Sequence, residues 1–346
     1  MHDTKISENQ INKNAVWNFW DTLENSAIDE LANGIGKTLA LDFIWHGFDP
    51  INKLDGIAAF INDFWLPLKK SFPDLKRETH IFMGGESNGR IDGDIALDGA
   101  MWVSGTGYFN AVFEKDYLNI RATGKQVNIR WGEFCKMKNG KIIEIYFLID
   151  VIDLMQQAGF ELLPPSCGKD GLYPPPLAND GILLKPQDEA ISNYSLKHIR
   201  KFIFEGLNGY DESDLKSMGM ADYFSPNLQW YGPGGIGACL SFKEFEEFHQ
   251  QPWLVAYPDR QVQNLDALIA EGNFSGGPGW AGVKATHTSQ YLNFPATGKS
   301  IKINGLDWWK REGEMYIENW VFVDMVHLFR QFGVDLFERL ELLKNE

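Results

Sequence analysis

The sequence lacks the long apolar runs and the basic excess that membrane and nucleic-acid partners require. No apolar run reaches the roughly 18 residues of a membrane-spanning helix. Lys and Arg number 32 against 47 Asp and Glu, which gives a formal net charge of −15. Because a negative chain repels phosphate backbones and anionic lipid, we expect neither nucleic acid nor a membrane as a partner.

Cysteine is also scarce, and the usual motifs of metal and nucleotide sites are missing or misplaced. Cys135, Cys167 and Cys239 are odd in number and lack CxxC spacing. Residues 1–14 are polar and lack the apolar core of a secretory signal, so we predict a reduced, cytoplasmic setting and no bound metal. Residues 232–237 match GxGxxG, but an antiparallel pattern follows them rather than the strand–helix–strand unit that binds dinucleotides.

Aromatic side chains are abundant. The 346 residues include 24 Phe, 12 Trp and 11 Tyr, together 14% of the chain. Each such side chain buries about 150–250 Å². They predict a thick core, a large interface or an aromatic-lined cavity, in a chain long enough for about two domains of ~150 residues.

An internal repeat divides the chain. YLNIRATGK at 117–125 matches YLNFPATGK at 291–299 in seven of nine positions, an offset of 174 residues. The same offset places Glu133 on Asp307, and an upstream offset of 185 places Trp45-His46-Gly47 on Trp230-Tyr231-Gly232. An ordered series of this kind indicates a duplication.

The region between the copies is rich in proline and glycine, which is typical of a linker. We predict a first domain at 8–162, a linker at 163–186 and a second domain at 187–346. Each copy has an amphipathic helix, a short strand, a second helix, long strands with tight turns, and a last short helix. Helices followed by an antiparallel sheet indicate an α+β fold.

One carboxylate interrupts an otherwise apolar strand face in each copy, Glu133 in the first and Asp307 in the second. Such a carboxylate costs several kcal/mol unless it is paired or protonated, so it is either a structural hydrogen-bonding group or a pocket residue. Two-residue turns at Asn139-Gly140 and Glu312-Gly313 predict that Glu133 faces Tyr146 and that Asp307 faces Glu318. A further turn near residues 297–298 predicts His287 close to Asp307 or Trp308.

These motifs resemble the SnoaL-like polyketide cyclase family of the nuclear transport factor 2-like superfamily. The resemblance is carried by the order of an opening helix, Trp-His/Tyr-Gly, Pro-Asp, Thr-His-Thr, Ala-Thr-Gly-Lys and Glu-Asn-Trp-Val-Phe-Val-Asp. It implies two cone-shaped domains, each a curled sheet closed by helices around an apolar cavity, and sheet-to-sheet pairing that a tandem chain could satisfy internally. It also implies aldol-type ring closure without metal or cofactor, with Asp324 or its counterpart Asp150 as the acid/base.

The leading hypothesis is therefore a cofactor-independent acid–base enzyme that acts on a small apolar carbonyl compound in the second domain. Its candidate catalytic residues are Asp324, Asp307 and His287. The expected pocket lining is Tyr231, Trp280, Trp309, Glu318, Trp320 and Phe322. The equivalents in the first domain are His46, Trp131, Glu133, Tyr146 and Asp150. The alternatives are a non-catalytic binding or scaffold protein of the same fold, and a dehydratase or hydrolase with a His–Asp pair.

Overall fold

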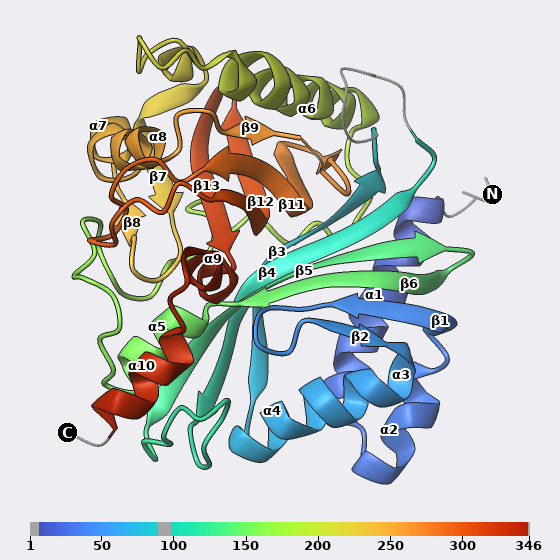
Figure 1. The fold of residues 1–346 in the computed structure, drawn as a ribbon. Coiled ribbons are helices and arrows are strands. Elements are labelled where there is room, and N and C mark those ends of the chain that lie inside the picture. The colour runs from blue at the N-terminus through green and yellow to red at the C-terminus, as the bar shows by residue number, and fades with distance from the viewer. Residues whose placement is uncertain (1–6, 89–97, 264, 345–346) are drawn as a thin grey trace.

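The computed structural model describes residues 7–88, 98–263 and 265–344, in which each copy is a sheet covered by helices (Figure 1). The α+β class predicted from the order of helices and strands is confirmed, and each sheet is mostly antiparallel. Residues 345–346, at the end of the predicted second domain, lie outside the described residues. No helix within the described ranges is long and apolar enough to cross a membrane.

The first copy contains a six-stranded sheet in the order β2-β1-β6-β5-β4-β3, in which only β1 and β6 are parallel neighbours. Its elements are α1 (Glu8–Asn25), α2 (Ile28–Ile35), β1 (Leu39–His46), β2 (Lys53–Asp55), α3 (Gly56–Ala59), the π-helical η1 (Phe60–Trp65), α4 (Leu66–Ser71), β3 (Lys76–Glu86), β4 (Met101–Val112), β5 (Gln126–Lys138), β6 (Lys141–Ile149) and α5 (Val151–Gln157).

The second copy repeats this arrangement, with strands in the order β10-β11-β12-β13-β7-β8 and β9 also paired with β11. Its elements are α6 (Glu189–Lys201), the π-helical η2 (Phe202–Gly206), η3 (Leu207–Gly209), η4 (Met220–Asp222), β7 (Phe224–Tyr231), β8 (Ala238–Cys239), α7 (Phe242–Phe245), the π-helical η5 (Glu246–Gln250), α8 (Gln251–Ala256), β9 (Gln261–Val262), β10 (Ile269–Glu271), β11 (Phe274–Thr286), β12 (Ser300–Glu312), β13 (Met315–Val323), α9 (Met325–Phe332) and α10 (Leu336–Leu343).

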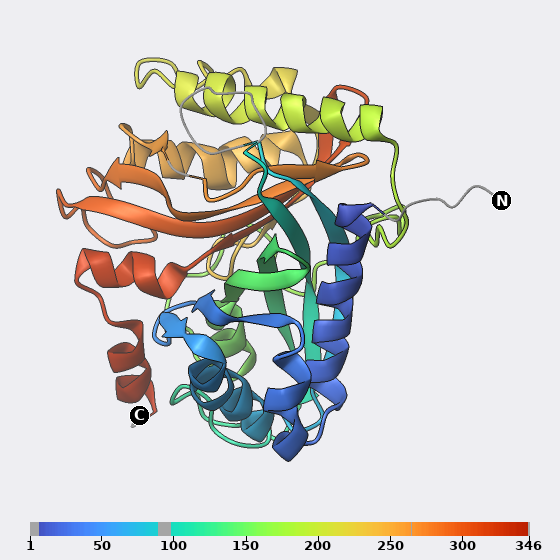
Figure 2. The same ribbon diagram turned by 90° about the vertical axis from the view of Figure 1, so that its right-hand side faces the viewer.

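Helix α1 shows why each copy opens with a helix on a sheet. Val16, Phe19, Trp20 and Leu23 recur at helical spacing and are all buried, while the Ser7 side chain caps the first turn. Helices α1, α3 and α4 cover one face of the first sheet, and α6, α7 and α8 cover one face of the second (Figures 1 and 2).

The repeated Tyr-Leu-Asn motif is a tight turn. Leu118 and Asn119 have φ angles of 49° and 63°, and Leu292 and Asn293 have φ angles of 46° and 64°. Positive φ is unusual for leucine and better tolerated by asparagine, so this motif specifies a local backbone shape. The two copies match so closely here because both use this turn.

Because of where this turn lies, His287 is not at its predicted position. The chain reverses at Leu292 and Asn293 rather than near residues 297–298, so the His287 amide bonds to the Lys299 carbonyl. Asp307 instead lies opposite Gly277, much farther along β11. The predicted proximity of His287 and Asp307 is therefore wrong.

The predicted pairing of Glu133 is wrong by one residue. The two-residue turn at Asn139-Gly140 forms as expected. A bulge in β6, where Ile143 is unpaired, then shifts the register, so Glu133 pairs with Phe147 and not with Tyr146.

The predicted pairing of Asp307 with Glu318 is also wrong. The β12–β13 turn falls one residue later than expected, and a bulge in β13 adds a second shift. Asp307 pairs with Val321, while Glu318 pairs with Lys310. Because side chains alternate, Asp307 and Glu318 point to opposite faces of the sheet.

The uncovered faces of the two sheets pack against each other. Trp308 of β12 stacks on Phe134 of β5 with ring centroids 4.8 Å apart, and its Nε1 donates to Ser104 Oγ at 2.8 Å. Arg130 of β5 donates to the Gly232 carbonyl at 2.8 Å. Each sheet thus has one face toward its own helices and one toward the other copy.

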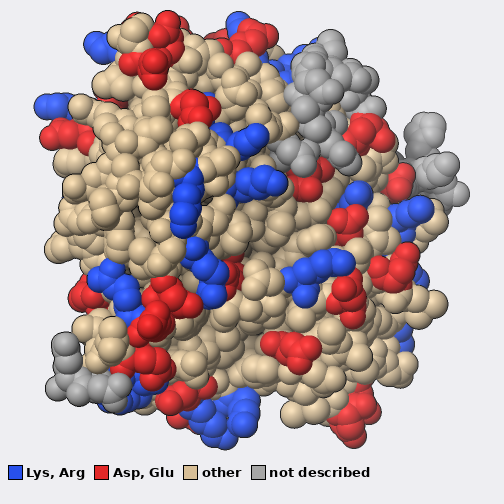
Figure 3. Space-filling model, viewed as in Figure 1, with Lys and Arg blue, Asp and Glu red and all other residues tan. Residues whose placement is uncertain are grey.

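The C-terminal helix crosses to the first copy. In Figure 1, α10 extends from α9 to the end of the first copy at which α5 lies. Lys344, just beyond α10, donates to the Asn119 carbonyl at 2.9 Å. On the molecular face shown in Figure 3, acidic and basic side chains are interspersed.

We predict that Trp308→Ala lowers the free energy of unfolding by about 3–5 kcal/mol, because it opens a cavity between the sheets and removes the hydrogen bond to the Ser104 hydroxyl. Leu41→Ala, at a strand position that is 97% exposed, should change stability little. Chemical denaturation of both variants tests this. Equal stabilities would mean that the sheet contact contributes little.

Candidate functional site

An apolar cavity lies between the helix-covered face of the second sheet and the helices above it. Its volume is about 190 Å³, somewhat larger than the ~150 Å³ engineered cavity that holds a benzene molecule. Alternate residues of β12 and β13 form its floor, namely Ile303, Gly305, Asp307, Trp309, Asn319, Val321 and Val323. Two π-helical segments, η2 and η5, border it, and such segments are frequent at functional sites.

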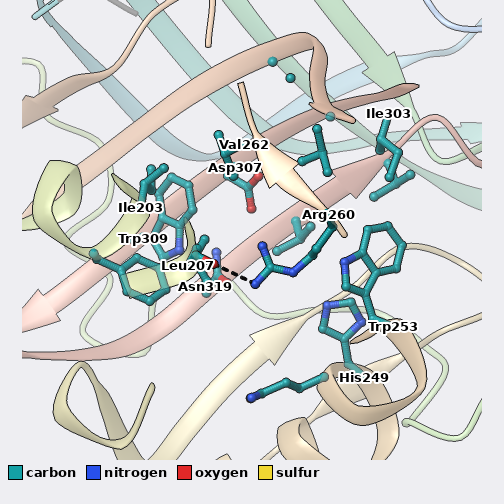
Figure 4. A pocket seen from close by; sticks show the side chains of 18 of the residues that line it. Ile203, Leu207, His249, Trp253, Arg260, Val262, Ile303, Asp307, Trp309 and Asn319 are labelled. Carbon is teal, nitrogen blue, oxygen red and sulfur yellow. Dashed lines mark hydrogen bonds between the residues drawn. The ribbon is translucent and has the colours of Figure 1, made fainter. Parts of the chain in front are cut away.

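Asp307 is the carboxylate in the cavity floor (Figure 4). Burial raises its pKa to about 7, although a hydrogen bond from Asn319 and the charge of Arg130 act in the opposite direction. Burial is the larger effect because the surrounding wall is mainly apolar and cannot solvate the ion. A carboxyl group titrating near neutrality can both accept and return a proton.

Four further polar residues line the cavity at positions where the first copy is apolar, and one of them is Gln250, which the 185-residue offset places on Trp65. The 185-residue offset places His249 on Phe64 and Arg260 on Leu75, and the 174-residue offset places Asn319 on Ile145. These residues were missed by the sequence analysis. The signal that could have found them is an apolar-to-polar change between aligned copies.

His249 keeps the packing role of its apolar counterpart. It stacks on Trp230 with centroids 4.2 Å apart, just as Phe64 stacks on Trp45 at 4.5 Å. Burial, with the nearby Arg260 charge, lowers the pKa of His249 to about 3, so the ring is neutral at physiological pH.

The corresponding space in the first copy is filled with side chains. Glu133 Oε1 accepts from Trp20 Nε1 at 2.6 Å and from Cys135 Sγ at 3.1 Å. The Arg77 guanidinium lies over the rings of Trp20 and Trp131, 4.5 and 4.1 Å from their centroids. Glu133 is therefore held as a structural hydrogen-bonding group, and Trp131 is a core residue.

Asp324 lies outside the cavity, in a contact between the copies. Its Oδ1 accepts from the His327 amide at the start of α9, at 3.0 Å, and its Oδ2 accepts from the Asp49 amide of the first copy, at 2.9 Å. Burial raises its pKa to about 7. Both oxygens thus accept backbone hydrogen bonds.

Asp150 makes the equivalent contact in the other direction, from the first copy to the second. It accepts from the Asp153 amide at 3.1 Å and from the Gly234 amide of the second copy at 2.8 Å. A Cβ at Gly234 would lie 2.6 Å from the Asp153 amide nitrogen, so only glycine fits. The GxGxxG run therefore serves this contact in the described structure.

His287 is buried away from Asp307. Its ring stacks on Phe332 with centroids 4.0 Å apart, and its Nδ1 is 3.2 Å from Thr297 Oγ1. Burial lowers its pKa. His287 does not line the cavity that contains Asp307.

The expected pocket residues divide between the two faces of the sheet. Trp309 lies on the cavity face. Phe322 also borders the cavity, but its ring packs on the opposite face, against Trp308 and 4.0 Å from the Arg130 guanidinium. Glu318 and Trp320 lie on the other face, because the register shift described above turns them toward the first copy and the linker. Glu318 is 3.3 Å from Lys310 Nζ and accepts from the Leu177 amide at 2.9 Å.

The remaining expected pocket residues form contacts between the copies. The Tyr231 carbonyl accepts from Arg130 Nη2 of the first copy at 3.0 Å. Trp280 packs against Tyr146, which stacks on His46 at 4.4 Å. None of these three, Tyr231, Trp280 or Tyr146, lines the cavity of the second copy.

Among the described residues, no group of three or more His, Cys, Asp or Glu side chains is arranged to hold a metal ion. The polar groups of the cavity are instead one carboxyl, one amide, one imidazole and one guanidinium, from Asp307, Asn319, His249 and Arg260, together with Gln250. Such a set can move a proton and stabilise charge on a small molecule.

Comparisons with known proteins give structural similarity only. No family model matches the sequence, and no curated protein does. A proposed SnoaL-like polyketide cyclase from Jannaschia sp. CCS1 is 12% identical and covers 43% of this chain and 97% of its own, with a TM-score of 0.36. AclR, a proposed hydroxylase from Streptomyces galilaeus, is 18% identical and covers 40% and 85%, with a TM-score of 0.33.

A SnoaL-like polyketide cyclase from Agrobacterium tumefaciens is 14% identical and covers 39% of this chain and 96% of its own, with a TM-score of 0.30. Each match spans about two fifths of the chain, which is the length of one copy. Similar solved structures thus include the family that the sequence motifs resemble, and at these identities the likeness concerns the fold alone.

We predict that Asp307→Asn stabilises the protein at high pH. The folded-state pKa of about 7 lies above the ordinary 3.8, so the native state binds the extra proton and loses stability as pH rises from about 4 to 7. The variant lacks this loss. The variant's free energy of unfolding, relative to wild type, should be higher at pH 8 than at pH 4.5 by more than about 1 kcal/mol. Denaturant unfolding at both pH values measures this difference. The exposed-site control Asp42→Asn should show no such difference.

We also predict that Asp324→Ala and Asp150→Ala each lower the free energy of unfolding by about 1–3 kcal/mol, because each loses a helix cap and a bond between the copies. Denaturant titration measures both. A neutral effect of either change would rule out the structural role assigned to that carboxylate.

Proposed function

We propose that the second copy binds a small apolar carbonyl compound and that Asp307 removes and returns a proton next to the carbonyl group. The observation that carries this proposal is a single carboxyl group with a pKa of about 7 in the floor of an apolar cavity. At neutral pH such a group is present in both protonation states, which favours general acid–base catalysis. The reaction class is a cofactor-independent cyclisation, isomerisation or related carbon–carbon chemistry.

Asn319 supports the role of Asp307. Its side chain donates to the Trp308 carbonyl at 2.9 Å and also hydrogen-bonds Asp307. A fixed amide beside the carboxyl group holds it in one orientation, so less entropy is lost when the reactive geometry forms. The neutral His249 ring on the helix side can donate to an oxygen on which negative charge develops.

Asp307 is a better candidate than Asp324 because its carboxyl group faces the cavity, whereas both Asp324 oxygens accept backbone amides. The His–Asp dehydratase or hydrolase hypothesis lacks support, since His287 stacks on Phe332 away from Asp307. Both carboxylates are therefore compared in the test.

The test is hydrogen–deuterium exchange next to a carbonyl group, which requires no knowledge of the natural substrate. Acetophenone, 1-tetralone and 2-tetralone are incubated with the protein in D₂O, and loss of the α-proton signal is followed by NMR. We expect exchange with at least one ketone, a loss of about 100-fold or more in Asp307→Asn, and a change of less than tenfold in Asp324→Asn. The rate should rise with pH and level off above about 7, as Asp307 ionises.

The matched control is Glu133→Gln, which changes the repeat-related carboxylate in the filled interior of the first copy and should leave exchange unchanged. Ketone binding without any exchange would contradict the catalytic proposal and favour the binding-protein alternative. Full exchange in Asp307→Asn would remove Asp307 from the mechanism.

A further inference from the structure

Arg260 is a buried cation without a counter-ion. It follows the turn after α8, and its side chain points into the cavity (Figure 4). Only 7% of its surface is exposed. Its Nη2 donates to the Leu207 carbonyl at 3.0 Å and contacts the Met218 sulfur. In the described part of the chain, no carboxylate lies within ion-pair distance of it, and its Nε and Nη1 groups have no hydrogen-bond acceptor.

A guanidinium in this position is costly, and burial lowers the pKa of Arg260 to about 10. The fold itself does not require it. The first copy has the same structure at this point with the buried Leu75, which lies at the equivalent position. A residue that costs stability and is dispensable for the fold indicates a function.

The surroundings of Arg260 suit an anion with an apolar body. The neutral His249 ring and the Trp253 ring line the same side of the cavity (Figure 4). The floor on the other side is apolar apart from Asp307 and Asn319. A guanidinium binds a carboxylate through charge-assisted hydrogen bonds, which are about twice as strong as hydrogen bonds between neutral groups.

We infer that the ligand of this cavity is an apolar monocarboxylate, whose carboxylate group accepts a charge-assisted hydrogen bond from the Arg260 guanidinium. Its apolar body lies between the helices and the sheet, and its far end reaches Asp307. The inference rests on the proposed function of the cavity, which it narrows from carbonyl compounds to keto acids that carry the ketone away from the carboxylate.

The test compares carboxylates with neutral amides of the same shape. Isothermal titration calorimetry at pH 7.5 measures binding of benzoate, benzamide, 2-naphthoate and 2-naphthamide to the full chain. We expect the wild type to bind at least one carboxylate about tenfold or more tightly than its amide. This comparison needs no variant, so it does not depend on the folding of a mutant.

Arg260→Leu then copies the residue of the first copy. We expect this variant to lose the preference for the carboxylate while binding the amide within about threefold of wild type. Arg121→Leu, which removes the same charge at an exposed site, should keep the preference. Equal binding of carboxylate and amide by the wild type, no carboxylate binding, or an unchanged preference in Arg260→Leu would overturn the inference.

The proposed function and the proposed anion site can be contradicted independently of each other. Asp307→Asn should retain the carboxylate preference even though it loses exchange activity, because it leaves Arg260 in place. A protein that exchanges ketone protons but does not prefer carboxylates keeps the proposed function and loses this inference. A protein that prefers carboxylates but exchanges nothing keeps the anion site and loses the catalytic role of Asp307.

Discussion

The packing of one sheet against the other is the constraint on which the rest of the structure depends. One face of each sheet packs against the other copy through contacts of Trp308, Phe134 and Arg130. The opposite face must then be covered by the helices of its own copy, and any cavity must lie on that side. This division decides that Asp307 faces the cavity while Glu318, on the alternate face, pairs with Lys310 at the linker.

Within this shared frame the two copies have diverged in their interiors. The first copy fills its interior with aromatic rings and the Arg77 guanidinium, and its carboxylate Glu133 accepts a hydrogen bond from Trp20. The second copy leaves a cavity of about 190 Å³ and replaces apolar residues with His249, Arg260 and Asn319. A duplicated fold allows this difference because the well-packed first copy can maintain stability while the second copy loses some stability by forming a cavity.

The reciprocal aspartates show how a residue type associated with catalysis in a family can be structural in one chain. Asp150 and Asp324 each cap a helix of their own copy and accept an amide from the other. A carboxylate is suited to this because its two oxygens can satisfy donors from two directions. The carboxylate at the end of the last strand thus forms a contact between the copies, and the carboxyl group that lines the cavity is Asp307.

The sequence by itself determined the duplication, the α+β class, the opening helices and the apolar strand face that contains one carboxylate, because these follow from local periodicity and from comparing the copies. It did not determine strand register, since two bulges and a left-handed turn at Leu292 and Asn293 depend on backbone geometry. Tertiary structure therefore decided which carboxylate reaches the cavity, that His287 lies elsewhere, and that no carboxylate among the described residues pairs with Arg260. These outcomes depend on which faces two sheets present to each other, and one residue of register reverses every face.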